Sequence, residues 1–341
     1  MKAEGVRAVA DQSQLAVVGL AEVVTSLPRI WQEYRRLVEA AQRERPDAAI
    51  LTDSSGFHLR VAKALKQLGI PVIYLVAPQA WAWRRGRVKQ LRRNVTKLLC
   101  IFPFEEKFFR AHGVSAYYIG HPLSRLVKPS QSRTDFFQEQ GLDPARRLVA
   151  LLPGSRRGEI GRHLPILGDA VTDLAGRHPD LQFVLGTPAG LDSTFIETSL
   201  QGLPVRVARG RSWDLMAYCD VAAMASGTVT VEAALLGTPM VTFYRVSALT
   251  WFVGRPLVNV PHFSMVNLIA ERRVVPELIQ EDATGANLAA EVSKLLTDSQ
   301  ARDSMKRSLG EVSSALATEG DPLERAAAHV VELIEKKYAH R

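Results

Sequence analysis

The chain has 341 residues, of which 47% are hydrophobic and 23% are charged, and a formal net charge of +8. This composition is typical of a globular protein, and the length gives room for two domains with separate cores. The excess of cations predicts an anionic partner: a nucleic acid, an anionic membrane or a phosphorylated substrate.

The sequence indicates neither membrane-spanning segments nor secretion. No apolar run approaches the roughly 20 residues that a spanning helix needs, and the first residues are mixed and polar, unlike a secretory signal. The two cysteines, Cys100 and Cys219, lie far apart and lack the spacing of metal ligands. We therefore expect reduced thiols in a cytoplasmic protein.

The first apolar stretch is residues 15–24, which include Val18 and Leu20. As a helix it would have an apolar surface broader than a single buried stripe requires. It is therefore either a core helix or an exposed patch for lipid or a partner.

A buried strand is predicted over residues 47–52, and Asp53 follows it directly. In a doubly wound sheet the carboxyl ends of the strands face the ligand crevice, so Asp53 would stand where a general base can act. The alternative is that Asp53 only caps the helix predicted over 57–68.

A second strand over 71–76 leads into a segment with two tryptophans and several arginines. Trp81, Trp83, Arg84 and Arg85 would form an aromatic, cationic surface that suits nucleic acid or an anionic membrane. The alternative is a solvated helix face with the tryptophans packed beneath it.

The alternation of strands and helices continues through the first half of the chain, with strands over 97–102 and 116–119 and a helix over 103–112. This pattern indicates parallel α/β structure. Residues 124–134 are predicted to be a linker. We accordingly place one domain at 1–130 and a second at 131–318.

The second domain begins with a strand over 148–152 and a glycine turn that contains Arg156. A guanidinium at this place could neutralise a diphosphate, because its planar fork matches phosphate oxygens. Further strands are predicted over 181–185 and 205–208.

Residues 222–241 predict a strand, a tight turn, a helix and a second strand. In the turn, Ser226, Gly227 and Thr228 could cradle a phosphate at the helix start, although the same residues suit a plain N-cap. Two glycine turns after strands of one sheet favour a ligand crevice over either turn alone.

The tail is predicted to be helical from residue 287, with Leu288, Val292, Leu295 and Leu296 on one face. Another amphipathic helix is predicted over 323–338. We expect residues 319–341 to pack back onto the first domain.

Six segments resemble, in order, those of the lipid-A-disaccharide synthase family. They are APQAWAWRRGRV at 77–88, FPFE at 102–105, IGHPL at 119–123, LLPGSRRGEI at 151–160, ASGTVTVEA at 225–233 and VVPELIQED at 274–282. The resemblance covers nearly the whole chain. It implies a GT-B fold, with two Rossmann-like doubly wound parallel-sheet domains facing across a cleft.

The resemblance also implies a reaction. The family joins UDP-2,3-diacylglucosamine to 2,3-diacylglucosamine 1-phosphate (lipid X) by an inverting transfer that forms the β-1,6 disaccharide precursor of lipid A. Asp53 would then be the base and Arg156 would stabilise the leaving UDP. Neither a metal nor a cofactor is expected.

The donor site implied by the resemblance comprises Gly154, Ser155, Glu159, Ser226, Gly227, Thr228, Glu232, Asn267, Arg272 and Glu277. Among these, Glu232 would bond the ribose hydroxyls. The acceptor and membrane side comprises Val18, Leu20, Trp81, Trp83, Arg84 and Arg85. The protein is then expected on the cytoplasmic face of the inner membrane as a peripheral protein, with no nucleic-acid partner, and a homodimer is also considered.

The chain departs from the family pattern in three places. It begins after the family's first strand and Gly-rich turn, so we expect the natural start to lie upstream of Met1. Gly56 and His58 stand where the family usually has Asp and Asn, and Glu271 stands where it usually has Gly. Two alternatives stay open: another GT-B enzyme that uses a UDP-sugar, with a different acceptor or as an epimerase, and a non-catalytic membrane-binding remnant.

Overall fold

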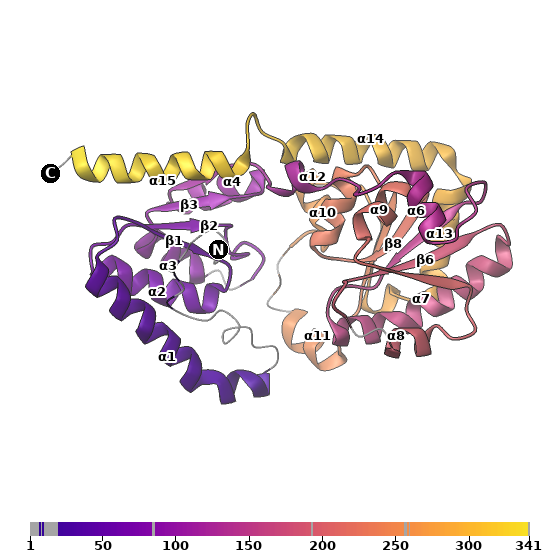
Figure 1. Cartoon of the computed structure of the whole chain (residues 1–341), viewed down its shortest axis with the longest axis horizontal. Helices are drawn as coiled ribbons and strands as arrows, with labels where there is room; N and C mark the ends of the chain where they lie inside the picture. Colours follow the sequence, from indigo (N-terminus) through magenta and orange to yellow (C-terminus); the bar gives the residue numbers. More distant parts are fainter. Residues whose placement is uncertain are drawn as a thin grey trace. The chain divides into compact units, whose positions relative to one another are not determined.

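The computed structural model describes residues 7, 9, 20–83, 86–191, 194–255, 258 and 260–339, with backbone alone for 20–26 and 253. The chain divides into two compact units. Unit 1 comprises Met1–Gly120 and Gly320–Arg341, and unit 2 comprises His121–Glu319. In Figure 1 each unit is a sheet covered by helices.

In the described part of unit 1, four parallel strands form a sheet in the order β1-β2-β3-β4. They are β1 (Ala49–Thr52), β2 (Val72–Leu75), β3 (Lys97–Cys100) and β4 (Ala116–Tyr118). One row of paired residues crosses the sheet from Leu51 through Tyr74 and Leu98 to Ala116. The central strand β3 is buried along its whole length, as expected for a parallel sheet with both faces covered.

The described part of unit 1 also contains five longer helices. They are α1 (Leu20–Glu44), α2 (Ser55–Gln67), α3 (Gly86–Asn94), α4 (Pro103–Ala111) and α15 (Pro322–Ala339). The last of them is attached to unit 1 by ion pairs, because Lys97 Nζ lies 2.6 Å from Glu332 and Lys337 Nζ lies 3.1 Å from Asp47. Since Lys97 is buried, its pair with Glu332 satisfies a charge that would otherwise be costly.

The sheet of unit 2 has six parallel strands in the order β10-β9-β8-β5-β6-β7. They are β5 (Leu148–Leu152), β6 (Gln182–Thr187), β7 (Val205–Arg209), β8 (Val221–Ala225), β9 (Met240–Tyr244) and β10 (Glu277–Ile279). The chain runs outward from β5 to β7, returns to the centre at β8, and then runs outward in the other direction. The strand order therefore reverses between β5 and β8, both of which are fully buried.

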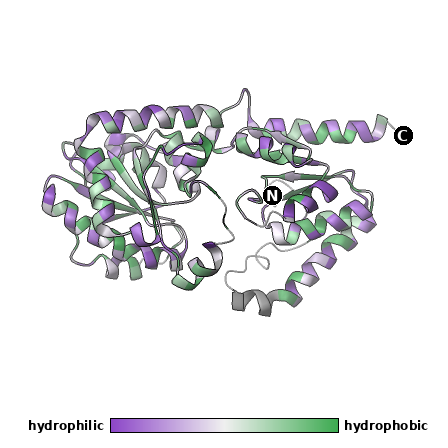
Figure 2. Cartoon of the chain, turned by 180° about the vertical axis from the view of Figure 1, so that it is seen from behind, coloured by the Kyte–Doolittle hydropathy of each residue, from purple (hydrophilic) through white to green (hydrophobic). Residues whose placement is uncertain are grey.

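The helices of unit 2 follow the strands in alternation. They are α5 (Leu123–Leu126), α6 (Arg133–Glu139), α7 (Arg157–Arg177), α8 (Thr194–Ser199), α9 (Ser212–Tyr218), α10 (Thr228–Leu235), α11 (Ala248–Gly254), α12 (Met265–Ala270), the 3₁₀ helix η4 (Gln280–Asp282), α13 (Gly285–Thr297) and α14 (Ser299–Leu316). The parallel α/β fold class is thus confirmed for both units. Figure 2 shows the hydrophobic colouring concentrated on the strands that these helices cover.

Helices α7 and α13 pack closely against each other, and glycine makes this approach feasible. A Cβ at Gly285 would lie 2.3 Å from the Cβ of Asp169. The four apolar side chains predicted to share one face of this helix are all buried: Leu288, Val292, Leu295 and Leu296.

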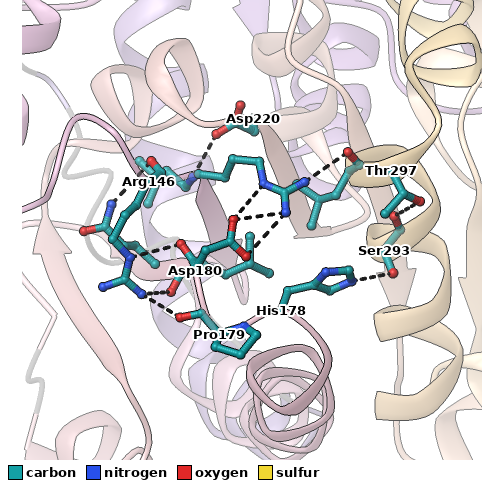
Figure 3. A network of polar contacts seen from close by, with 12 residues as sticks. Arg146, His178, Pro179, Asp180, Asp220, Ser293 and Thr297 are labelled. Atoms are coloured by element: carbon teal, nitrogen blue, oxygen red, sulfur yellow. Dashed lines mark hydrogen bonds and ion pairs between the residues drawn. The ribbon is translucent and has the colours of Figure 1, made fainter.

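A polar network fixes the amino edge of the unit 2 sheet (Figure 3). The Arg146 guanidinium donates to the carbonyl oxygens of Pro179, Asp180 and Leu181 at 3.0, 3.0 and 2.9 Å. The Leu148 N–H donates to Asp220 Oδ2 at 2.8 Å. These bonds hold the start of β5 to the segments before β6 and β8.

The segment at 124–134, predicted as a linker, is anchored within unit 2. Asp214 on α9 is buried and accepts the N–H groups of Ser130 and Gln131 at 2.6 and 3.2 Å. It also accepts the Ser130 hydroxyl at 2.7 Å. Three donors on one buried carboxylate compensate the free-energy cost of its burial.

Candidate functional site

The two glycine turns of unit 2 lie at the same edge of the sheet. Strands β5 and β8 are parallel neighbours, with Leu152 paired to Met224 at their ends. The turn 153–156 follows β5 and the turn 226–228 follows β8, so both turns lie at the carboxyl edge where the strand order reverses. In open parallel sheets this reversal is the usual position of a ligand crevice.

Gly154 is required by the geometry of the first turn. Its φ is +116°, and a Cβ there would lie 2.3 Å from Glu159 Oε2. The Glu159 carboxylate folds over the turn and accepts the Ser155 N–H at 3.1 Å. Arg156 follows with extended backbone and an exposed side chain. Its guanidinium is therefore accessible next to the first turn of α7.

A buried histidine on α7 is hydrogen-bonded to this turn. His163 on α7 is fully buried, with Nδ1 2.7 Å from the carbonyl oxygen of Pro153 and Nε2 3.1 Å from the backbone nitrogen of Arg245. Since the carbonyl can only accept and the N–H can only donate, the ring is the neutral tautomer protonated at Nδ1. Burial lowers the pKa of His163 from its ordinary value. The imidazole thereby connects the turn after β5 to the end of β9.

Tyr244, at the end of β9, completes this side of the site. Its pKa is raised first by burial and then by the charge of the Glu159 carboxylate. The phenol is therefore neutral at physiological pH.

The second turn leaves Gly227 and Thr228 exposed at the start of α10. The Ser226 N–H donates to the Phe243 carbonyl at 2.9 Å, and its hydroxyl donates to the Phe263 carbonyl at 3.0 Å. Ser226 thus fixes the turn to two neighbouring segments. The free N–H groups of the first turn of α10 carry partial positive charge that suits an anion.

Glu232 lies one turn along α10 from Thr228. Its Oε2 accepts the indole N–H of Trp213 on α9 at 2.7 Å. The carboxylate is therefore held in one orientation, and its other oxygen makes no hydrogen bond to a residue that the structure describes.

Asn267 and Glu277 support the chain around the second turn. Asn267 is fully buried, and its side-chain oxygen accepts the N–H groups of Val274 and Val275 at 2.7 and 2.9 Å. Glu277 accepts the Asn267 amide at 2.8 Å. It also accepts the N–H groups of residues 263 and 264. Both side chains therefore fix the backbone of neighbouring segments. One of the fixed residues is Phe263, whose carbonyl oxygen accepts the Ser226 hydroxyl.

Arg272 has different partners from the rest of the expected donor site. Its guanidinium donates to Ser308 Oγ at 3.0 Å and pairs with Glu311 at 2.6 Å, both on α14. Arg272 is thus attached to α14. The other expected donor residues on the two turns and the helices that follow them lie at the ends of neighbouring strands: Gly154, Ser155, Arg156, Glu159, Ser226, Gly227, Thr228 and Glu232.

In unit 1, Asp53 lies at the carboxyl end of β1 with an exposed side chain. Asp53 and Ser54 have φ values of +55° and +38°, in the left-handed region. Tyr74 Oη donates to the Asp53 carbonyl, and His58 Nδ1 lies 3.0 Å from the same oxygen. The N-cap residue of α2 is Ser54, whose side chain makes no capping hydrogen bond. Asp53 is therefore not the cap of this helix.

The tryptophan segment lies at the same edge of this sheet, after β2. Trp81 is buried and donates to Glu105 Oε1 at 3.0 Å. Arg87 lies over the Trp83 ring at 5.0 Å and donates to Ser55 Oγ at 2.7 Å. Arg87 therefore links this segment to the turn that carries Asp53.

Four expected membrane-side residues are described only in part or not at all. Val18, Arg84 and Arg85 lie outside the described residues, and Leu20 is described by its backbone alone. No helix in the described part of the chain is long and apolar enough to cross a membrane. Within the same residues, no group of three or more His, Cys, Asp or Glu side chains is arranged to hold a metal ion.

Three supporting residues were not predicted from the sequence: His163, Trp213 and Glu105. Burial raises the pKa of Glu105 to about 8, against the lowering effect of its bond from Trp81. Each of these side chains acts on a residue distant in sequence. For His163 and Glu105, the only signal in the sequence was a polar residue at a position expected to be buried.

Comparison with known proteins identifies one family that matches most of the chain. Residues 1–329 match the model of a family described as lipid-A-disaccharide synthetase. A lipid-A-disaccharide synthase of Solibacter usitatus is 54% identical, with 100% of this chain and 89% of the relative covered. One of Koribacter versatilis is 45% identical, covering 99% and 89%. The UDP-GlcNAc 2-epimerase of Neisseria meningitidis, solved with UDP-GlcNAc, is similar in fold, with a TM-score of 0.58, 14% identity, and 94% and 82% covered.

We predict that His163→Leu lowers the free energy of unfolding of unit 2 by about 1–3 kcal/mol, because a buried carbonyl and a buried N–H lose their partner. His163→Gln keeps one donor and one acceptor and should lose less. Urea unfolding followed by tryptophan fluorescence measures both changes.

The same experiment tests the protonation state of His163. The pKa of His163 in the folded protein lies below its value of about 6.5 in the unfolded chain. Its contribution to the free energy of unfolding is therefore complete above about pH 6.5 and is lost as the pH falls through the lowered pKa. The parent should therefore lose stability between pH 7 and pH 5 more steeply than His163→Gln. Equal slopes would contradict a neutral buried imidazole.

Proposed function

Because the chain belongs to the lipid-A-disaccharide synthetase family, we propose that its turns after β5 and β8 hold the diphosphate of the donor. The protein is a glycosyltransferase that makes the lipid A disaccharide, and its substrate is a UDP-sugar. The observation that carries the proposal is the position of both turns at the reversal of strand order. Two helix starts there present free N–H groups to one anion.

The proposed donor is UDP-2,3-diacylglucosamine and the proposed acceptor is 2,3-diacylglucosamine 1-phosphate. The acceptor 6-hydroxyl attacks the anomeric carbon of the donor and forms the β-1,6 bond. The bond between this carbon and the diphosphate breaks, and UDP leaves with its electron pair. The hydroxyl proton passes to a base, and the configuration at the carbon is inverted.

Asp53 is the proposed base. Its exposed carboxylate, at the end of a strand, can reach a hydroxyl of a bound acceptor. Two successive non-glycine residues, Asp53 and Ser54, have left-handed backbone, which is uncommon although Asp tolerates it better than most residue types, and such conformations are concentrated at functional sites. The hydrogen bonds from Tyr74 and His58 to the Asp53 carbonyl offset the cost of this backbone and fix the turn.

Arg156 is the proposed counter-charge for the leaving group. As the glycosidic bond breaks, negative charge grows on the diphosphate, and an adjacent guanidinium stabilises the transition state more than the ground state. The N–H groups at the starts of α7 and α10 act in the same direction. We propose that Glu232, which accepts the Trp213 indole N–H, also accepts hydrogen bonds from the ribose hydroxyls. We propose that the transfer needs neither a metal nor a cofactor.

We further propose that the protein acts as a peripheral protein on the cytoplasmic face of the inner membrane. Both proposed substrates carry acyl chains, which partition into a bilayer. The segment with Trp81, Trp83 and Arg87 lies beside the Asp53 turn, where a lipid acceptor would arrive. The epimerase alternative is not favoured, because the likeness to an epimerase is one of fold alone.

Asp53→Asn should reduce kcat by about 10²–10⁴-fold, because the amide cannot accept the hydroxyl proton. Asp303→Asn, an exposed change on α14, serves as the matched control and should retain parental turnover. Mass spectrometry of the disaccharide 1-phosphate measures product. Parental turnover by Asp53→Asn would exclude it as the base.

Arg156→Ala should lower kcat/KM by about 10²-fold or more, and Arg156→Lys should recover part of the loss. The neighbouring Arg157→Ala is the control, because the Arg157 guanidinium stacks on Phe195 at 4.9 Å. Initial rates at varied donor concentration separate the two parameters. If both alanine variants lose the same activity, the effect is one of overall charge and the specific role fails.

A further inference from the structure

Helix α11 presents apolar side chains to the outside of unit 2. Leu249 is 74% exposed and Phe252 is 80% exposed, the two highest values among the large hydrophobic side chains that the structure describes. They stand three positions apart, so they lie on the same face of the helix. Burying such residues is strongly favourable, so a contiguous exposed pair indicates a contact surface.

The opposite side of α11 is firmly attached. Ser247 caps the helix by accepting the Thr250 N–H at 3.2 Å. The Trp251 ring packs on Phe263 with centroids 6.1 Å apart, and the Arg255 guanidinium lies about equally close to both rings, at 5.9 and 6.0 Å. The helix is thus held by aromatic and cation–π contacts while its apolar pair stays outside.

The charge around α11 has one sign. The sequence from Arg245 to Ala270 contains no acidic residue. Arg245 and Arg255 are both exposed, and they lie in sequence before the start and after the end of the helix. Such a surface complements anionic lipid headgroups, and an apolar pair beside Arg and Trp suits the interface of a bilayer. Two copies meeting through this face would bring Arg245 and Arg255 against cations of the same sign, which disfavours a second copy as the occupant.

We propose that α11 is a membrane-contacting element of unit 2, with Leu249 and Phe252 inserted between the lipids and Arg245 and Arg255 on anionic headgroups. This proposal rests on the proposed function in one respect, because a diacylated donor must reach unit 2 from a bilayer. The helix is well placed for this, since Arg245 N–H is bound by His163, which also supports the turn of Gly154. The membrane would thus approach the same edge of the sheet as the donor cradle.

Co-sedimentation of the full chain with vesicles tests the proposal, using phosphatidylcholine alone or with phosphatidylglycerol and neither substrate. The double variant Leu249→Gln, Phe252→Gln should lower the partition coefficient on anionic vesicles at least tenfold. The control variant Leu323→Gln, Val331→Gln removes two exposed apolar side chains from α15 and should stay within twofold of the parent. Arg245→Gln should weaken binding to anionic vesicles and leave the weaker binding to phosphatidylcholine unchanged.

Parental vesicle binding by the α11 variant would overturn the proposal. A parent that is dimeric in sedimentation equilibrium while the α11 variant is monomeric would also overturn it, because the face would then join two copies. Thermal unfolding at the parental temperature verifies that the variant is folded. Turnover of short-acyl, water-soluble substrates distinguishes the two hypotheses. An α11 variant that turns over these substrates but does not bind vesicles supports the proposal. A parent protein that binds vesicles but does not turn over these substrates refutes the enzyme function alone.

Discussion

The reversal of strand order between β5 and β8 is the constraint on which the site depends. Parallel strands all end at one edge, and right-handed crossovers direct the chain after β5 and the chain after β8 to opposite faces of the sheet. The turns at 153–156 and 226–228 therefore start at neighbouring strands and diverge. The first N–H groups of each of these two helices have no partner within their own helix. Under the proposed function, a diphosphate accepts hydrogen bonds from them.

A layer of buried polar side chains gives this edge its shape. His163 joins the turn after β5 to the end of β9, and Glu277 with Asn267 holds the backbone to which Ser226 is bonded. Because each of these side chains is hydrogen-bonded to backbone groups, moving one segment would leave buried donors or acceptors unsatisfied. Positions that resemble family donor residues can therefore act through the backbone they support, without touching a ligand.

Much of the fold could be predicted from the sequence, because buried parallel strands are short apolar runs bounded by glycine or proline. The predicted strand over 148–152 matches β5, and the buried face of α13 was predicted residue by residue. Helix α11 gave no such signal, since its apolar residues Leu249 and Phe252 are exposed. The pairing of Trp213 with Glu232 and the position of His163 under Pro153 depend on tertiary packing, which periodicity does not encode. Asp53 was placed at its strand end, but its left-handed backbone has no sequence signature.

Amide hydrogen exchange of the full chain with and without saturating UDP tests the central claim most directly. The account predicts slower exchange at residues 153–159 and 226–232, where the two turns would close around the diphosphate. It predicts no change at 178–182, at the opposite edge of the same sheet (Figure 3). UDP binding that leaves both turns unprotected, or that protects only segments away from β5 and β8, would contradict a donor cradle at the reversal of strand order.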